Sequence, residues 1–269
     1  MADCFPRNKQ IPDQSPLYWV SHKDRYLRQL LISDIESETE RDLVVYFTDT
    51  DNSLAGIDPG DDQFLYELLR QRQRDGVDLL LETPGGYTDT TEKLCAMLRS
   101  MAPDLRVVVP RRAKSNGTLM ALASKEILMS STSELGPIDP SLNNIPAEFI
   151  LNDPTSNPLL KQAALTATMQ TKRLAKELLM SGMMSEATAA QVEETVSLLA
   201  SRQRFHSHGS VVDAEEAKNL GLAVKVLDHS DPLWQKFWLL RSMYAYDAPR
   251  NGHAKIYEAA KISTAVSAK

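Results

Sequence analysis

Three short loops of this chain carry the residue types that could perform chemistry. Their sequences are Thr-Pro-Gly-Gly at 83–86, Ala-Lys-Ser-Asn-Gly-Thr at 113–118 and Leu-Gly-Pro-Ile-Asp-Pro at 135–140. Each loop follows a predicted strand, and active sites of parallel α/β sheets lie at the carboxyl ends of their strands. We therefore expect the three loops to meet at one edge of a sheet.

Ser115 is the candidate nucleophile of the second loop. It stands between a predicted strand and a predicted helix, and Gly117 follows two residues later. That position would expose the hydroxyl and direct the amides of a helix N-terminus at it, where they would stabilise a developing oxyanion. The alternative is that Ser115 only caps the helix, as serine often does. Taken alone, this loop fits the capping role better.

Gly85 and Gly86 could supply hydrogen-bond donors to a reacting group. Two glycines after a buried strand allow unusual φ angles and close backbone approach, so that their N–H groups can point at a ligand. An ordinary tight turn would explain the pair equally well. The two loops, about 30 residues apart on successive strands, favour a functional interpretation together, because one can supply the oxyanion donor and the other the nucleophile.

The elements around these loops predict a largely parallel α/β fold. Continuous apolar runs indicate buried strands, and helical periodicity fills the segments between them. Strands that alternate with helices indicate crossover connections and parallel pairing. The expected strands are 43–47, 77–81, 105–109, 126–129 and 224–227. The expected helices include 25–38, 90–101 with Asp89 and Glu92 as a capping box, 157–180, 185–200 and 213–221. The tail 251–269 is expected to be partly helical or loose.

Composition excludes several classes of protein. The chain has 269 residues and a net charge of −6, which argues against non-specific nucleic-acid binding. Its two cysteines, Cys4 and Cys95, exclude a disulfide framework, and without a Cys/His cluster we expect no metal and no cofactor. The sequence has no apolar run of about 18 residues and no signal-peptide pattern, so we expect no membrane span and a cytoplasmic location.

In these motifs the chain resembles the serine dehydrogenase proteinase family, which is related to signal peptide peptidase A and to the Clp proteolytic subunit. The segments Ser15-Pro16-Leu17-Tyr18 and Asp213–Leu222 strengthen the resemblance, which spans about residues 15–227. It implies an α/β Clp/crotonase-type spiral of repeated ββα units with a C-terminal helical region. The corresponding boundaries are an arm at 1–16, a catalytic domain at 17–230 and an extension at 231–269.

The resemblance also implies roles for the loop residues. Ser115 would be the nucleophile, and the N–H groups of Asn116 and of Gly85 or Gly86 would form the oxyanion hole. The family usually has glycine or alanine where this chain has Asn116. The backbone donor survives that change, while the side chain can narrow the substrate cleft.

A serine nucleophile also needs a base to accept its proton. Clp subunits have a histidine about 25 residues after the serine, where this chain has Asp139. Relatives of signal peptide peptidase A use a lysine, which makes Lys161, in the first turn of the helix capped by Asn157, the first candidate. Lys172 on the same helical face is the second.

Two further groups leave alternatives open. His206 and His208 are a third option for the base, although their spacing favours a structured loop. Asp139 could orient the base or bind substrate backbone, or it could fix the turn, since aspartate before proline is a common turn former.

The leading functional hypothesis is hydrolysis of peptide bonds in peptide or protein substrates through an acyl-enzyme on Ser115. A crotonase-like acyl-CoA enzyme is the first alternative, with Arg111, Arg112 and Lys114 as possible phosphate contacts. A non-catalytic scaffold of the same fold is the second. Folds of this type usually pack against copies of themselves, so we expect a homo-oligomer with closed symmetry.

Overall fold

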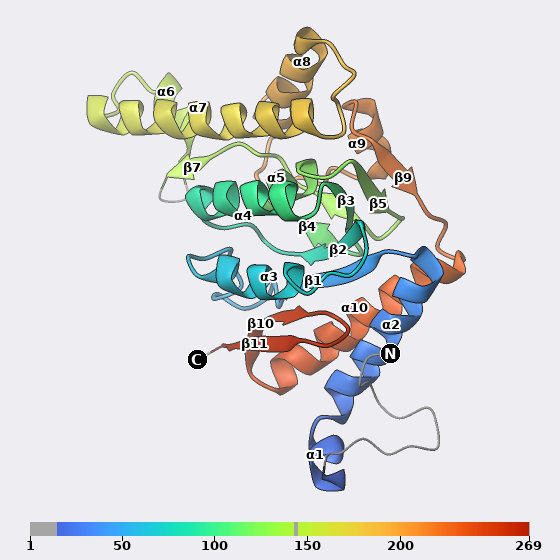
Figure 1. Cartoon of the computed structure of the whole chain (residues 1–269). Coiled ribbons are helices and arrows are strands. Elements are labelled where there is room, and N and C mark those ends of the chain that lie inside the picture. Colours follow the sequence, from blue (N-terminus) through green and yellow to red (C-terminus); the bar gives the residue numbers. More distant parts are fainter. Residues whose placement is uncertain (1–14, 143–144, 269) are drawn as a thin grey trace.

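The computed structural model describes residues 15–142 and 145–268, so that most of the expected arm at 1–16 lies outside the described residues. Within that range, one seven-stranded sheet runs through the molecule (Figure 1). Its strands, in spatial order, are β11 (Ser263–Ser267), β10 (His253–Glu258), β1 (Asp42–Thr48), β2 (Gly76–Glu82), β3 (Asp104–Val108), β5 (Glu126–Met129) and β9 (Val224–Val226).

The five strands from β1 to β9 pair in parallel, as the alternating sequence pattern predicts. Every residue of β1 and β2 is buried, because helices cover both faces of the sheet. Side chains of β1 point alternately to two cores: Val44 and Tyr46 join one, while Val45 and Phe47 join the other. The predicted strands 43–47 and 77–81 are thus confirmed.

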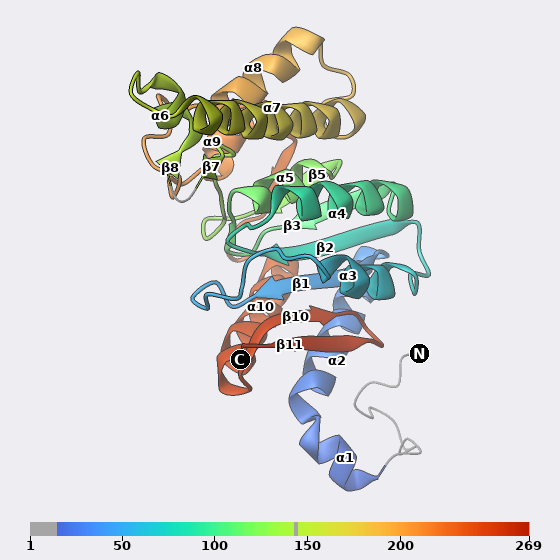
Figure 2. The same ribbon diagram turned by 90° about the vertical axis from the view of Figure 1, so that its left-hand side faces the viewer.

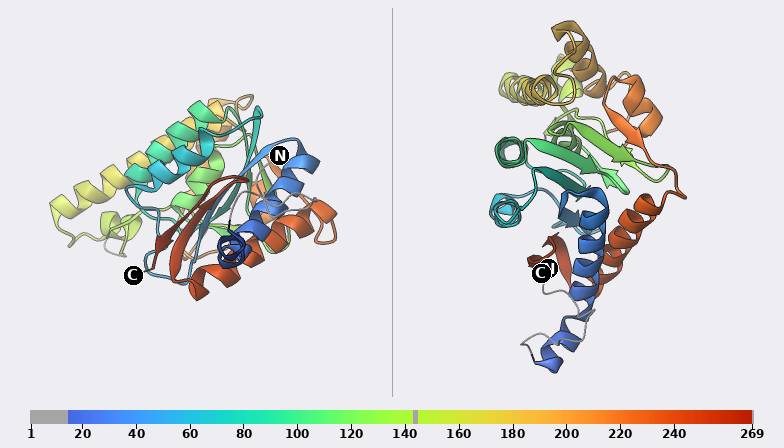
Figure 3. Two further views of the ribbon diagram at one scale, coloured as in Figure 1. Left: turned by 60° about the horizontal axis from the view of Figure 1, so that its bottom comes forward. Right: turned by 45° about the vertical axis from the view of Figure 1, so that its right-hand side comes forward.

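The two faces carry different helices, which lie on opposite sides of the sheet at the right of Figure 3. One face packs against α3 (Asp61–Leu69), α4 (Thr88–Met101) and α5 (Asn116–Leu122). The other face packs against α2 (Lys23–Thr39) and α10 (Pro232–Arg250). The short helix α1 (Pro16–Ser21) precedes α2. The crossovers through α3 and α4 bring the ends of β1, β2 and β3 to the same edge.

Helices that follow β5 and precede β9 in the chain form a second layer beyond α4 (Figures 1 and 2). It contains the hairpin β7 (Ser141–Leu142) and β8 (Ile145–Pro146), followed by α6 (Ala147–Asn152), α7 (Pro158–Ser181), α8 (Ala189–Leu199) and α9 (Ala214–Asn219). Asn157 caps α7 by accepting a hydrogen bond from Leu159 N, as predicted. A small parallel sheet of β4 (Arg112–Ala113) and β6 (Glu134–Leu135) lies below this layer.

Two expectations about elements are wrong. The tail expected to be helical or loose forms a β-hairpin over its described residues 253–267: β10 pairs antiparallel with β1, and β11 with β10. Its strand pattern is hidden because Lys255 and Glu258 are charged yet buried. The helix α4 begins at Thr88, so Asp89 and Glu92 lie inside it and do not cap it. Instead, they accept hydrogen bonds from Gln170 and Arg173 of α7.

The buried Lys255 holds the tail to the sheet through an ion pair with Asp61. Lys255 Nζ lies 2.9 Å from both carboxylate oxygens, and the two side chains are 2% and 4% exposed. Tyr46 Oη also donates to this carboxylate at 2.5 Å. The segment assigned to a C-terminal extension therefore completes the same sheet and charge network.

Replacing Lys255 by methionine is expected to lower the free energy of unfolding by about 3–5 kcal/mol, because the Asp61 carboxylate would stay buried without its cation. Urea unfolding measures the change. The matched control is Lys218→Met on exposed helix α9, expected to change the free energy by less than about 0.5 kcal/mol. A loss below about 1 kcal/mol for Lys255→Met would show that water reaches Asp61.

Candidate active site

Ser115 has an unusual backbone conformation between β4 and α5. Its φ of 52° and ψ of −119° lie where a residue with a Cβ is strained, at a cost of roughly 1–3 kcal/mol. It occupies the N-cap position of α5, yet its side chain makes no capping hydrogen bond. The hydroxyl is half-buried and forms no hydrogen bond with any described residue. The capping alternative therefore does not explain this serine.

The Gly85–Gly86 loop packs directly against Ser115. A Cβ built on Gly85, whose φ is 98°, would lie 2.8 Å from both Ser115 Cβ and Lys114 O. Only glycine allows this approach. On its other side the loop is braced by Ile57, whose N donates to Gly85 O at 2.8 Å and whose O accepts from Tyr87 N at 2.9 Å. The first two predicted loops thus lie in contact.

Two backbone N–H groups beside Ser115 are free to bind an oxygen atom. Gly85 N donates to Thr83 Oγ1 at 3.2 Å. Gly86 N and Asn116 N, in contrast, donate to no group of the described chain. Asn116 is buried, and buried amides are normally paired, so its unpaired N–H is unusual, while Gly86 is exposed and its N–H is open to a ligand. Two such donors close to a serine are characteristic of a site that binds a negatively charged oxygen. Of the two predicted glycines, Gly86 therefore has the available donor.

The third predicted loop also reaches Ser115. A Cβ on Gly136 would lie 3.2 Å from Ser115 N. Lys114 Nζ donates to Leu135 O at 3.2 Å and to Ser210 O at 3.0 Å, and it pairs with Glu134 at 3.1 Å. Partial burial lowers the pKa of Lys114. Lys114 therefore ties the loop of Ser115 both to 134–140 and to 201–212, which connects α8 to α9.

The loop 201–212 brings a histidine to Asp139. His208 Nδ1 lies 2.9 Å from Asp139 Oδ1. Arg202 Nε lies 2.7 Å from Asp139 Oδ2 and forms an ion pair with it, but the angle between the groups does not allow a hydrogen bond. The Asp139 side chain is 5% exposed, whereas that of His208 is 37% exposed. With Nδ1–H directed at a carboxylate, Nε2 of His208 is left as a proton acceptor.

The two predicted lysines lie on α7, in the second layer. Gln170 and Arg173 mark where α7 meets α4, and Lys172 lies half-buried between them. Lys161 is eleven residues from Lys172 toward the N-terminus of α7, or roughly 16 Å along the helix axis. Among the described residues, the side chains of the two lysines form no hydrogen bond with Ser115, and the same holds for those of His206 and His208. The role of Lys161 remains a prediction.

His208 pairs with Asp139, a contact that the sequence does not predict. Its loop lies about 90 residues from Ser115 in sequence and has no helical or strand period. One signal was available: Asp139 stands where Clp subunits have histidine, so the partner of a carboxylate had to come from elsewhere in the chain. The chain has only five histidines from which to choose.

The cations considered for a CoA phosphate are already paired. Arg111 lies 3.8 Å from Glu82 and Arg112 lies 3.7 Å from Glu134, the carboxylate that also pairs with Lys114. Glu82 is also bound through two hydrogen bonds of 2.7 Å from Arg241. These arginines therefore lie close to carboxylates at the loop ends.

Cys95 is a buried thiol of α4 and no second nucleophile. Burial raises its pKa to about 12. In a Cys4→Ser variant, where Cys95 is the only thiol, we expect reaction with a disulfide reagent at pH 8 to be about a thousandfold slower in the folded protein than in urea, since far less thiolate is present. Absorbance of the released thiol measures the rate, and equal rates would contradict the burial of Cys95.

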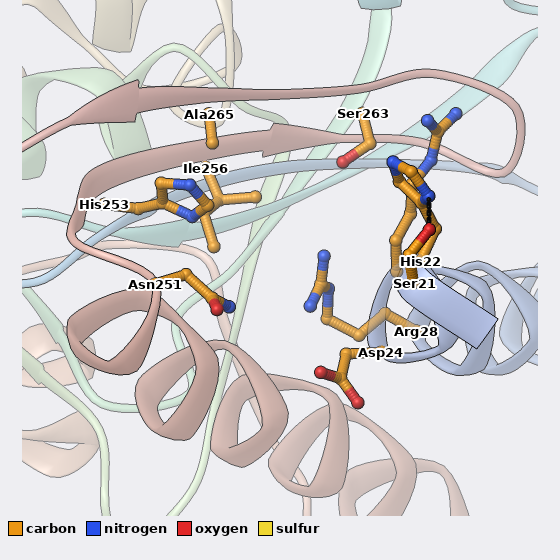
Figure 4. Close-up of a pocket in the computed structure, with 10 residues that line it drawn as sticks. Ser21, His22, Asp24, Arg28, Asn251, His253, Ile256, Ser263 and Ala265 are labelled. Carbon is orange, nitrogen blue, oxygen red and sulfur yellow. Dashed lines mark hydrogen bonds between the residues drawn. The ribbon is translucent and has the colours of Figure 1, made fainter. Parts of the chain in front are cut away.

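A hollow of about 530 Å³ lies elsewhere, between α1–α2 and the β10–β11 edge (Figure 4). Arg28 faces it, but its guanidinium pairs with Glu258 at 2.7 Å and with Asp247. His253 lines the same hollow, and burial lowers its pKa. Among the described residues, no helix is long and apolar enough to cross a bilayer, and no cluster of three metal-ligating side chains occurs.

Comparison with known proteins supports the family resemblance that the sequence motifs indicate. Residues 59–244 match the family described as ClpP-like SDH-type serine proteinase. The uncharacterized protein MJ0137 of Methanocaldococcus jannaschii is 28% identical over 169 residues, 61% of this chain and 59% of its own length. MJ1495 of the same organism is 37% identical over 75 residues, 28% of this chain and 26% of its own length. The chain thus matches less than two thirds of either relative.

Similar solved structures include a mutant of the 1510-N membrane-bound stomatin-specific protease, with a TM-score of 0.43, 21% identity, and coverage of 67% of this chain and 79% of that one. A ClpP1 mutant from Listeria monocytogenes gives a TM-score of 0.45 at 16% identity, covering 77% of this chain and 99% of that one. With the family match spanning more than half of its length, this mixed α/β chain of ClpP/crotonase-like fold belongs to the ClpP-like SDH-type serine proteinase family.

Proposed function

We propose that this protein is a serine-type peptidase that hydrolyses peptide bonds through an acyl-enzyme on Ser115. The observation that carries the proposal is the strained Ser115, whose hydroxyl has no described partner, next to the unpaired N–H groups of Gly86 and Asn116. A nucleophile held beside two preorganised donors is the arrangement that acyl transfer requires. Gly86 is exposed, so a substrate can reach the site.

We assign the general base to His208, oriented by Asp139. The contact of 2.9 Å between Nδ1 and Asp139 Oδ1 fixes the tautomer, and the link from Lys114 Nζ to Ser210 O holds the histidine loop against the nucleophile loop. Lys161, the first candidate from the sequence, competes for this role. The contacts favour His208, because its loop accepts a hydrogen bond from Lys114 at Ser210 O. Its partner Asp139 also belongs to the loop whose Gly136 packs against Ser115 N.

The proposed reaction has two halves. Ser115 Oγ attacks the scissile carbonyl carbon and passes its proton to His208 Nε2, while the Gly86 and Asn116 amides bind the oxyanion. Collapse breaks the C–N bond, and the imidazolium returns the proton to the departing amine. His208 then takes a proton from a water molecule, which attacks the carbonyl carbon of the ester. The ester C–O bond breaks, the imidazolium returns the proton to Ser115 Oγ, and the acid is released.

A fluorophosphonate probe tests the proposal. The folded protein should form one covalent adduct, which peptide mass spectrometry should place on Ser115. An intact protein without an adduct, or with an adduct elsewhere, would contradict the proposal. A thermal shift with acyl-CoA would support the crotonase-like alternative, which no contact of the structure favours, and an inert Ser115 would leave the scaffold alternative.

The substrate and assembly follow the same proposal. We expect the enzyme to cleave peptide or protein substrates without a cofactor. We also expect it to be cytoplasmic and to form a homo-oligomer. Exposed apolar side chains that an oligomer could cover lie on α1 and on the α6–α7 layer, namely Leu17, Val20, Phe149, Leu159 and Met169.

A further inference from the structure

The side chain of Asn116 links the two loops that carry the oxyanion donors. Its Nδ2 donates to Gly86 O and, at 3.2 Å, to Thr88 Oγ1. A carbonyl oxygen can only accept, so the NH₂ end of the amide must face Gly86. The residue is 7% exposed and stands in the first turn of α5.

This contact acts on the geometry of the site and not only on stability. The two donors, Gly86 N and Asn116 N, belong to segments 30 residues apart in sequence. Backbone bonds join these segments at Thr83, through Thr83 N to Arg112 O and Lys114 N to Thr83 O. Beyond Thr83, toward Gly86, the described hydrogen bonds between the two segments are those of the Asn116 side chain.

Glycine at 85 and 86 makes such a tie necessary. The backbone there is free of Cβ constraints, and Gly86 is exposed. Ile57 holds the neighbours Gly85 O and Tyr87 N from one side, and Asn116 holds Gly86 O from the other. Glycine or alanine at position 116 would keep the backbone donor but lose this second hold.

We propose that Asn116 is a positioning residue, whose side-chain amide fixes Gly86 relative to the nucleophile loop and so sets the spacing of the two oxyanion donors. This inference rests on the proposed function. Because the oxyanion forms only during reaction, the tie should matter more for the transition state than for substrate binding.

The first test is Asn116→Ala, which retains the backbone N–H. We expect kcat for a peptide substrate to fall about tenfold to a hundredfold, while KM changes less than about threefold. This loss of kcat is smaller than that expected when an oxyanion-hole donor is itself removed. Affinity for a peptide boronate, which places an oxygen in the oxyanion position, should fall by the same factor as kcat. The control Thr88→Val removes only the weaker partner and should change kcat less than about threefold.

The second test is Asn116→Asp, which preserves shape but sets a carboxylate against Gly86 O. At pH 7 it should react more slowly with the fluorophosphonate than Asn116→Ala. Below about pH 4 an ordinary aspartate is mostly protonated and can donate again, so the rate of Asn116→Asp should rise relative to that of Asn116→Ala. A purely structural role would leave that ratio independent of pH.

The outcomes separate this inference from the proposed function. If the wild-type protein labels at Ser115 while Asn116→Ala matches it in kcat and boronate affinity, Asn116 is not a positioning residue and the peptidase proposal stands. If the wild-type protein neither labels nor hydrolyses peptides, the peptidase proposal fails first. Parallel thermal unfolding of each variant identifies any loss caused by unfolding.

Discussion

Replacing Ser115 by alanine is expected to lower kcat for peptide hydrolysis by at least about a thousandfold, with little change in KM. The hydroxyl would be the only group that bonds covalently to substrate, and serine hydrolases lose factors of this size or more when it is removed. Removing a hydroxyl that has no described hydrogen-bond partner should not weaken the fold. Steady-state kinetics with a fluorogenic peptide measure the effect.

The matched control is Ser131→Ala, an exposed serine in the turn before β6. It should retain wild-type kcat and fluorophosphonate labelling. Equal hydrolysis by wild-type protein and Ser115→Ala would show that any cleavage comes from a contaminant or from another residue, and would leave the non-catalytic scaffold as the better account.

Replacing His208 by alanine is expected to reduce kcat by about a thousandfold or more, because no group would accept the Ser115 proton. Substrate binding should persist, so that KM changes little. The side chain is more than one third exposed, so the fold should tolerate the change. Lys161→Ala is the matched comparison on α7, and it should alter kcat by less than about threefold.

A larger loss of kcat for Lys161→Ala than for His208→Ala would identify the lysine as the base. If Lys161→Ala abolished hydrolysis while His208→Ala did not, the contact between His208 and Asp139 would be structural, and α7 would have to approach Ser115 in the working enzyme. Asp139→Asn helps to separate the cases: with a histidine base it should lower kcat, because an amide oxygen can hold Nδ1–H less strongly than a carboxylate can.

The sheet could be predicted because its signals are local. The apolar runs at Leu43–Phe47 and Val77–Leu81 fill both faces of a buried strand, and their alternation with helices dictates parallel pairing. The C-terminal hairpin could not be predicted in this way. Lys255 and Glu258 break its apolar pattern, and they are tolerated only because Asp61 and Arg28, more than 190 residues earlier, neutralise them.

The candidate site also contains residues that the sequence predicts and contacts that it does not. Gly85, Gly86 and Ser115 stand in loops whose residue types restrict the backbone, so the sequence alone indicates where they meet. The pairing of His208 with Asp139 depends on how loop 201–212 folds back over β6, through Leu135 and Val212. The sequence does not encode that return locally, and the same holds for the contact of Asn116 Nδ2 with Gly86 O.

A crystal structure of the protein with a peptide boronic acid tests the central claim most directly. The account predicts a bond between Ser115 Oγ and boron, with one boronate oxygen about 2.7–3.1 Å from both Gly86 N and Asn116 N. A boronate bound to Ser115 whose oxygens contact neither amide, or a soaked crystal in which Ser115 stays unmodified, would contradict it.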